Sequence, residues 1–148
     1  MTVVGYAPGV YDLFHVGHLN ILRHARLHCD RLVAGVVSDE NAARVKGRYP
    51  VVPLAERLEV VSALSLVDEA VAEVWGSKRE AWDHVRFDVI FKGDDWRGTP
   101  QGAALEASMA EVGVRVVYFP YTVHTSSTQL RRALELLGEG REPEAAAV

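Results

Sequence analysis

Hydrophobic residues fall along the chain in two alternating patterns, short continuous runs and longer segments with an apolar residue every three or four positions. The continuous runs predict buried strands, and the periodic segments predict amphipathic helices. The predicted strands are 2–7, 31–39, 69–75, 87–92 and 114–121. The predicted helices begin near Gly17 and then occupy 54–67, 77–86, 100–113 and 126–138. The remaining basic stretch at 40–53 contains a glycine and two prolines, and it predicts a loop.

This alternation predicts an α/β fold, a single-domain Rossmann-like, doubly wound parallel sheet of about five strands with helices on both faces. A chain of 148 residues is long enough for one domain with its own core. We assign that domain to 1–138 and expect 139–148, which is small and polar, to be a flexible C-terminal tail. Ligands of such sheets bind outside the carboxyl ends of the strands, so the segments that follow strands are the candidates for a site.

Composition and charge exclude some classes of binding partner and some cellular locations. A net charge of -4 and a pI near 5.8 disfavour nucleic acid, because phosphate backbones are bound by basic surfaces. No apolar stretch approaches the roughly 20 residues that span a bilayer, and the first residues do not resemble a signal peptide. We therefore expect no membrane association and a cytoplasmic location. Cys29 is the only cysteine, and we expect it to pack as a small buried side chain.

The segment GVYDLFHVGH at 9–18 links the first predicted strand to the first predicted helix. A helix amino terminus offers free N–H groups and a positive dipole end, which favour an anion. Gly17 would let a phosphate approach the backbone closely, and His15 and His18 can each donate a hydrogen bond to it. The alternative is that one histidine caps the helix while the other faces solvent. The spacing and position of the pair favour phosphate binding.

A second candidate segment is GDDW, which follows the fourth predicted strand. Gly93 permits a sharp turn or a close approach to a ligand. Asp94 and Asp95 offer carboxylates to ribose hydroxyls, a base amine or a metal, and Trp96 offers a ring that can stack on a base. The alternative is an exposed turn.

The third segment, TVHTSST at 122–128, is rich in hydroxyl groups at the start of the last predicted helix. Hydroxyls and free N–H groups there predict a second anion cradle, which is compatible with helix capping by Ser126 or Ser127. The three segments follow strands of one parallel sheet, so we expect them to meet at one edge.

Basic residues add to this picture. Arg44, Lys46 and Arg48 alternate in the predicted loop, where they form either a solvated charge run or a lid that neutralises a triphosphate. Arg57 can hold a second anion through its bidentate guanidinium, or pair with a glutamate at the surface. Lys78, near the start of its helix, has the same two interpretations.

The 9–18 segment resembles the Gly-x-Phe-Asp-x-x-His-x-Gly-His signature of the nucleotidyltransferase superfamily, with Tyr11 where phenylalanine is usual. The GDDW and TVHTSST segments, with VDE at 67–69, resemble the cytidylyltransferase branch, and within it the glycerol-3-phosphate cytidylyltransferases most. The resemblance implies that the phosphate of a small phosphorylated alcohol attacks the α-phosphate of CTP and releases pyrophosphate. It also implies Mg²⁺ carried by the triphosphate rather than by a protein metal site, and a homodimer, for which we expect 54–75 to form the interface.

The resemblance assigns roles to individual residues. The catalytic residues it implies are His15, His18 and Lys46. The nucleotide-binding residues it implies are Gly9, Val10, Tyr11, Asp12, Gly17, Arg48, Gly93, Asp94, Asp95, Trp96, Thr122, Ser126, Ser127 and Thr128. The residues it places on the acceptor's side are Lys46, Arg57 and Lys78.

The sequence departs from that pattern near its end. Tyr121 stands where the branch has an arginine, and His124 and Thr125 stand where it has Gly-Ile, so one phosphate ligand is missing. The stretch 44–64 also resembles an adenylyltransferase branch that acts on heptose phosphate, but the tryptophan of GDDW favours CTP. The alternatives are an adenylyltransferase for a sugar phosphate, a nucleotide-binding homologue without activity, and a cytidylyltransferase for phosphocholine, phosphoethanolamine or a phosphonate.

Overall fold

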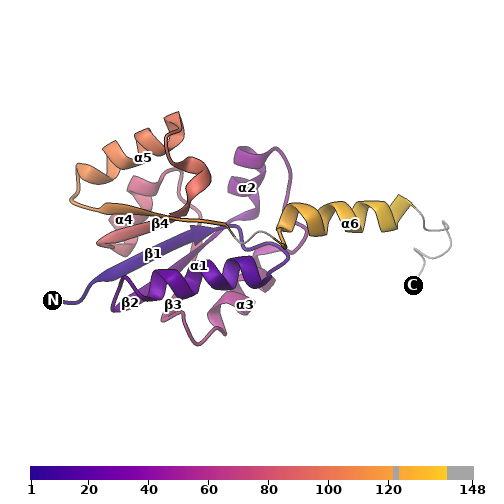
Figure 1. The fold of residues 1–148 in the computed structure, drawn as a ribbon, viewed down its shortest axis with the longest axis horizontal. Helices are drawn as coiled ribbons and strands as arrows, with labels where there is room; N and C mark the ends of the chain where they lie inside the picture. Colours follow the sequence, from indigo (N-terminus) through magenta and orange to yellow (C-terminus); the bar gives the residue numbers. More distant parts are fainter. Residues whose placement is uncertain (122–123, 140–148) are drawn as a thin grey trace.

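Five parallel strands form the centre of the computed structural model, which describes residues 1–121 and 124–139 (Figure 1). They are β1 (Val4–Gly9), β2 (Arg31–Val37), β3 (Glu69–Glu73), β4 (Val89–Gly93) and β5 (Arg115–Phe119). Their order in the sheet is β3-β2-β1-β4-β5, and every neighbouring pair is parallel. Successive strands are added on one side of β1 and then on the other, so the carboxyl end of β1 is the switch point where such sheets bind ligands.

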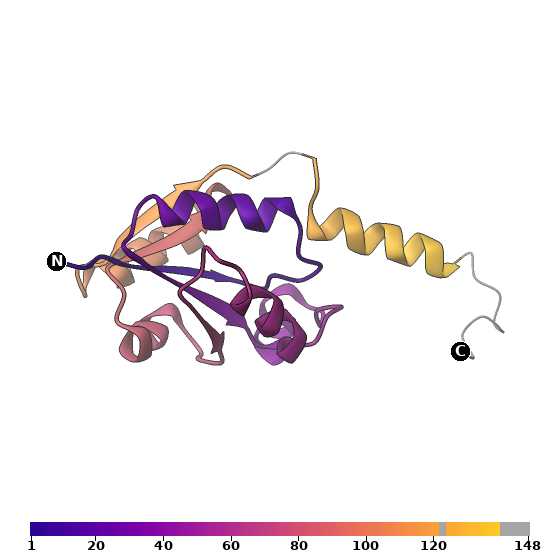
Figure 2. The same ribbon diagram turned by 90° about the horizontal axis from the view of Figure 1, so that it is seen from below.

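Helices cover both faces of the sheet, which confirms the predicted doubly wound α/β class. The helices α1 (Val16–Arg26) and α3 (Leu54–Ser62) pack on one face, and α4 (Lys78–Val85) and α5 (Pro100–Ala110) pack on the other (Figures 1 and 2). The first core is centred on Leu22, Val61 and Phe91, and the second on Tyr6, Phe87 and Met109, all of which are buried.

One predicted loop contains a helix. Within 40–53, which was expected to be irregular, the structure has α2 (Asp39–Lys46). The Ser38 side chain accepts a hydrogen bond from the Asn41 N–H, and Gly47, at φ 77°, ends the helix in the left-handed region. Only Ala42 of this helix is buried, so its sequence has no apolar stripe that would reveal it.

The other boundaries shift by a few residues. The helix expected at 54–67 ends at Ser62, and the first strand runs to Gly9 rather than to residue 7. Cys29 is half-buried rather than buried, and its thiol donates to the Ala25 carbonyl at 3.3 Å.

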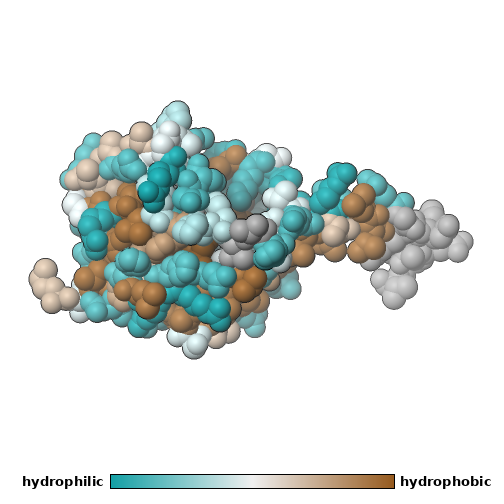
Figure 3. Space-filling model, viewed as in Figure 1, coloured by the Kyte–Doolittle hydropathy of each residue, from teal (hydrophilic) through white to brown (hydrophobic). Residues whose placement is uncertain are grey.

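The helix α6 (Ser127–Glu139) projects away from the body of the molecule in both ribbon views (Figures 1 and 2). Its Leu134, Leu136 and Leu137 are exposed, and Figure 3 shows apolar atoms on its surface. The helix continues through Glu139, the first residue of the expected tail, and the rest of that tail lies outside the described residues. The homodimer with an interface at 54–75 stays a prediction.

Candidate functional site

A cavity of about 740 Å³ lies at the carboxyl end of β1. It is lined by residues from the ends of β1, β3 and β4, from α1 and α2, and from the start of α6. The predicted site residues that line it are Gly9, Val10, Tyr11, Asp12, His15, Gly17, His18, Lys46, Arg48, Lys78, Gly93, Asp95, Trp96, Ser126, Ser127 and Thr128. Asp94 is exposed and is not among the lining residues, and Thr122 lies outside the described residues.

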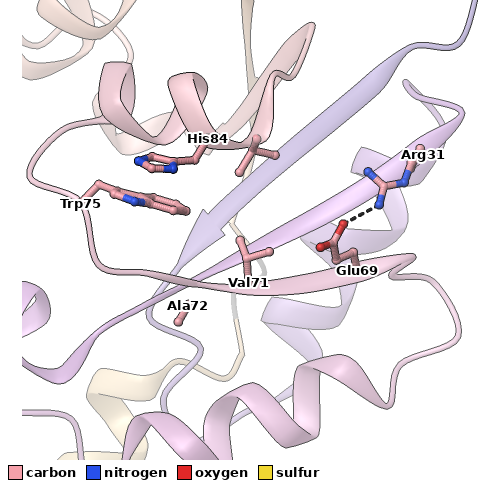
Figure 4. A pocket seen from close by; sticks show the side chains of 7 residues that line it. Arg31, Glu69, Val71, Ala72, Trp75 and His84 are labelled. Carbon is pink, nitrogen blue, oxygen red and sulfur yellow. Dashed lines mark hydrogen bonds and ion pairs between the residues drawn. The ribbon is translucent and has the colours of Figure 1, made fainter.

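A second cavity, of about 260 Å³, opens between the edge strand β3 and α4 (Figure 4). The indole of Trp75 stacks on the imidazole of His84 there, with centroids 4.7 Å apart, and Arg31 pairs with Glu69. Its two charged groups neutralise each other, so it offers no converging set of groups for an anion. The larger cavity is the candidate functional site.

The histidine pair is fixed by the start of α1. The Nδ1 atom of His15 accepts the Gly17 N–H at 3.0 Å, and the Nδ1 atom of His18 accepts the His15 N–H at 3.2 Å. In a neutral imidazole whose Nδ1 is an acceptor, the proton resides on Nε2. The two Nε2 atoms lie 3.3 and 3.5 Å from the hydroxyl oxygen of Ser127. Two N–H donors therefore point toward the same place in the cleft.

Gly17 makes room for the His15 imidazole, in addition to the close phosphate approach that the sequence predicts. A Cβ atom at Gly17 would lie 2.6 Å from Cε1 of His15, so only glycine allows the imidazole to fold back onto the helix backbone. His15 can therefore cap the helix through Nδ1 and direct its Nε2 donor into the cleft at the same time.

The cleft keeps both imidazoles neutral. Burial lowers the pKa of His18 to about 3, and the nearby His15 and Lys46 contribute in the same direction. Burial also lowers the pKa of His15. Neutral imidazoles with protonated Nε2 atoms can donate to phosphate oxygens without a change of protonation state at neutral pH.

Asp12 connects three segments beneath the cleft. Its carboxylate accepts the N–H groups of Val51 and Val52 at 2.8 and 2.9 Å and an Arg131 N–H at 3.2 Å. Burial alone would raise the pKa of Asp12, but these donors outweigh it and the pKa is lowered. The Asp12 carbonyl also accepts the Ser127 hydroxyl at 2.7 Å. Asp12 therefore holds the 51–52 loop and the start of α6 against the histidine loop.

Arg57 does not reach the cleft, which corrects the predicted acceptor contact. Its side chain is buried, and it donates to the carbonyls of Val52, Val10 and Val37 at 2.8, 2.6 and 2.8 Å. It also pairs with Asp39 at 2.6 Å. With its donors used in this way, Arg57 joins α3 to the ends of β1 and β2 and to α2.

Two cations of the cleft were not predicted, Arg131 and Lys92. Arg131 lies one helical turn after Ser127. The hydroxyl-rich start of that helix was therefore the sequence feature that could have indicated Arg131 as a site residue. The pKa of Lys46 is lowered by its partial burial in the cleft and by the positive charges of Arg131 and Arg48. Lys46, Arg48 and Arg131 therefore share one region of the cavity, where a polyanion would relieve their mutual repulsion.

The turn after β4 brings Gly93, Asp95 and Trp96 to the cavity. The Tyr121 ring covers Gly93, where a Cβ atom would lie 2.3 Å from that ring, and its hydroxyl donates to Asp95 at 2.9 Å. Trp96 packs against the second core, and its ring centroid lies 4.0 Å from Nζ of Lys92. Tyr121, which stands where an arginine was expected, thus orders the turn and positions Asp95.

Among residues 1–121 and 124–139, no group of three histidine, cysteine or acidic side chains is arranged to hold a metal ion. In the same part of the chain, no helix is long and apolar enough to cross a membrane.

Fold and site together define a Rossmann-like α/β domain with paired histidine donors and a cationic cleft at its topological switch point. Residues 6–133 match the family described as Cytidylyltransferase-like, so the chain belongs to that family within the nucleotidyltransferase superfamily.

Individual proteins agree with this assignment. The chain is 37% identical over 130 residues to an ethanolamine-phosphate cytidylyltransferase of Arabidopsis thaliana, covering 84% of this chain and 30% of that protein. It is 33% identical over 129 residues to the bifunctional protein HldE of Hyphomonas neptunium, covering 86% of this chain and 26% of that protein. The chain thus spans less than a third of either relative. A solved structure, a lipopolysaccharide core biosynthesis protein of Thermoplasma volcanium, matches with a TM-score of 0.69 and 26% identity over 84% of this chain and all of that one.

Proposed function

We propose that this chain transfers CMP from CTP to the phosphate of a small phosphorylated alcohol, forming a CDP-alcohol and pyrophosphate, with glycerol 3-phosphate as the first acceptor to test. The observation that carries the proposal is the pair of neutral imidazoles whose Nε2 atoms meet in a cleft that Lys46 and Arg131 also line. The family and the named activity of the Arabidopsis relative support CTP as the donor.

In this reaction an oxygen of the acceptor phosphate attacks the α-phosphorus of CTP. The bond between that phosphorus and the oxygen bridging to the β-phosphate breaks, and pyrophosphate leaves with the electron pair. The attacking oxygen is already anionic, so no general base is needed. What remains for the protein is to position two anions and to stabilise the charge that develops between them.

The side chains of the cleft suit those tasks. His15 and His18 would donate Nε2–H bonds to oxygens of the transferring and leaving phosphates. Lys46 would bridge donor and acceptor phosphates, and Arg48 and Arg131 would contact the triphosphate. Ser127, which now lies between the imidazoles, would give way to a phosphate oxygen or donate to it.

Mg²⁺ belongs to this proposal as a companion of the triphosphate, where it would neutralise charge on the leaving pyrophosphate. Of the carboxylates that line the cavity, Asp12 and Glu73 are each paired with a basic side chain, while Asp95 is exposed and accepts one hydroxyl. Asp95 is therefore the residue that best suits the ion.

Pyrophosphate release with a matrix of nucleotides and acceptors tests the proposal. CTP, ATP, GTP and UTP are each paired with glycerol 3-phosphate, phosphoethanolamine, phosphocholine, heptose 1-phosphate and a hydroxyalkylphosphonate. We expect turnover with CTP, and a loss of about 100-fold or more in kcat for His15→Ala, because a preorganised donor to the transition state is removed. His24→Ala, at an exposed position of the same helix, is the matched control and should retain full activity.

Two other results of the pyrophosphate-release assay would contradict the proposal. Turnover with ATP alone would move the chain to the adenylyltransferase branch. If CTP raises the Tm but no acceptor releases pyrophosphate, the chain is a nucleotide-binding protein and the proposed reaction is wrong.

A further inference from the structure

The cavity extends beyond the histidines to the ends of β3 and β4, where a buried acid lies. Glu73 is only 3% exposed, and its two oxygens accept from the Tyr6 hydroxyl at 2.7 Å and from Nζ of Lys78 at 2.5 Å. Tyr6 reaches it by crossing Gly35, where a Cβ atom would lie 2.1 Å from the tyrosine oxygen. This part of the cavity is therefore a rigid, polar wall rather than a flexible surface.

Lys92 faces the same region from the end of β4. Its ammonium lies 4.0 Å from the centroid of the Trp96 ring, and no described residue accepts a hydrogen bond from it. Burial lowers its pKa to about 8, with a smaller contribution in the same direction from Lys78. A desolvated ammonium is costly unless an acceptor or an anion pairs with it, so Lys92 has unused capacity to bind a ligand.

Lys92, Glu73 and Lys78 line the same cavity as Lys46, which serves the proposed transfer site. The charges of Glu73, Lys78 and Lys46 all act on the Lys92 ammonium. Glu73 is neutralised by Lys78, and Lys92 carries the charge that is left over. An acceptor that contacts all four side chains could place its phosphate at Lys46 and Lys92 and its remaining atoms against Glu73 and Lys78.

We propose that Lys92, Lys78 and Glu73 form the acceptor subsite and select a hydroxyl-bearing phosphate, a polyol or sugar phosphate, over one with a cationic tail. Lys92 binds the acceptor phosphate, while Glu73 accepts from hydroxyl groups and Lys78 donates to them. An ammonium or trimethylammonium tail meets the Lys78 ammonium at a carboxylate that is already paired. The inference rests on the proposed function, and it would separate this chain from the Arabidopsis relative, which is named for ethanolamine phosphate.

Steady-state kinetics of Lys92 variants test the subsite. Lys92→Met keeps length and removes charge, Lys92→Arg keeps charge, and Arg97→Met is the matched control, because Arg97 is an exposed neighbour outside the cavity. We expect Lys92→Met to raise the KM for glycerol 3-phosphate about tenfold or more, since a charge-assisted hydrogen bond is lost, while the KM for CTP changes less than twofold. Lys92→Arg should recover part of that loss, and Arg97→Met should match the wild type.

Acceptor choice gives the second readout. The wild type should use glycerol 3-phosphate or heptose 1-phosphate with a kcat/KM at least tenfold above that for phosphoethanolamine or phosphocholine. Equal or better use of the cationic acceptors overturns the inference, as does a Lys92→Met variant whose two KM values rise together or not at all.

Calorimetric titration with glycerol 3-phosphate separates the subsite from the reaction. If no acceptor is turned over, the proposed function fails, but binding by the wild type that is weakened at least tenfold in Lys92→Met still supports the subsite. Equal binding by both proteins, or none by the wild type, overturns it.

Discussion

At the scale of single residues, the histidines of the cleft depend on backbone contacts for their chemistry. Each Nδ1 is occupied by a main-chain N–H, so the tautomer is set by the local fold of the helix start rather than by a carboxylate partner. The sequence spacing indicated two phosphate ligands, and the structure adds the reason that both are neutral donors. The same burial that sets their protonation also makes the stability of the protein depend on pH.

His18 should make the protein less stable as the pH falls. Its pKa is about 3 in the folded protein, against about 6.5 in an unfolded chain, so between these values the unfolded state binds more protons. Its contribution is fully present above about pH 6.5 and is lost at up to about 1.4 kcal/mol per pH unit below it. His15, whose pKa is also lowered, acts in the same direction.

Urea unfolding of the wild type and of His18→Gln at pH 7.5, 6.0 and 5.0 measures this effect. The wild type should lose stability over this range and the variant should lose less. His24→Gln, which changes an exposed histidine, should follow the wild type. The lowered pKa of Asp12 confines its own effect to more acidic solutions, below its unfolded value of about 3.9. Parallel curves for the wild type and His18→Gln would contradict the assigned neutral state.

At the scale of elements, the hydrophobic pattern predicted the strand and helix alternation, and the sheet confirmed it. The pattern missed α2 because only one of its side chains is buried, and its presence rests on the caps at Ser38 and Gly47. It also gave no means of knowing which way a basic side chain points. Arg57 was expected in the cleft and lies in the interior, whereas Lys92, which ends a buried strand, was overlooked and lines the cavity.

Arg57 should therefore matter for stability rather than for binding. Arg57→Met would leave the carbonyls of Val10 and Val37 and the Asp39 carboxylate without their donor. We expect the free energy of unfolding to fall by about 1–3 kcal/mol or more, because buried carbonyl acceptors lose their donor, whereas the Asp39 side chain is 30% exposed and can be solvated. Arg44→Met is the contrasting variant, because Arg44 is exposed and lines the cavity, so it should weaken CTP binding at unchanged stability.

Chemical denaturation and the KM for each substrate, measured below the unfolding transition, distinguish the two roles. An Arg57→Met protein that is as stable as the wild type, with a raised KM for the acceptor, would restore the original interpretation of a substrate contact.

At the scale of the whole molecule, charge is distributed unevenly. The formal net charge is -4, yet the cleft is lined by six lysine and arginine side chains and three carboxylates. The cations are Arg44, Lys46, Arg48, Lys78, Lys92 and Arg131. A cleft with an excess of positive side chains in a low-dielectric wall focuses the field on its opening, so it attracts a polyanion although the molecule as a whole repels it.

Salt should therefore weaken nucleotide binding more than it slows the chemical step. The Debye length exceeds about 10 Å at 50 mM KCl and falls to between about 3 and 8 Å at 500 mM. The higher salt concentration therefore screens the exposed arginines that line the cleft. We expect the KM for CTP to rise several-fold, with kcat nearly unchanged, at constant MgCl₂.

Two variants locate the source of that dependence. Arg44→Gln with Arg48→Gln, which removes two exposed cations of the cleft, should flatten the salt dependence of the KM for CTP. Arg31→Gln removes one exposed cation at the opposite end of the sheet, and the salt dependence of its KM for CTP should match that of the wild type. If Arg31→Gln flattened the salt dependence as much as the double variant, attraction would come from the charge of the whole surface rather than from the cleft. A KM that did not respond to salt at all would mean that buried contacts alone, such as those of the two histidines, hold the triphosphate.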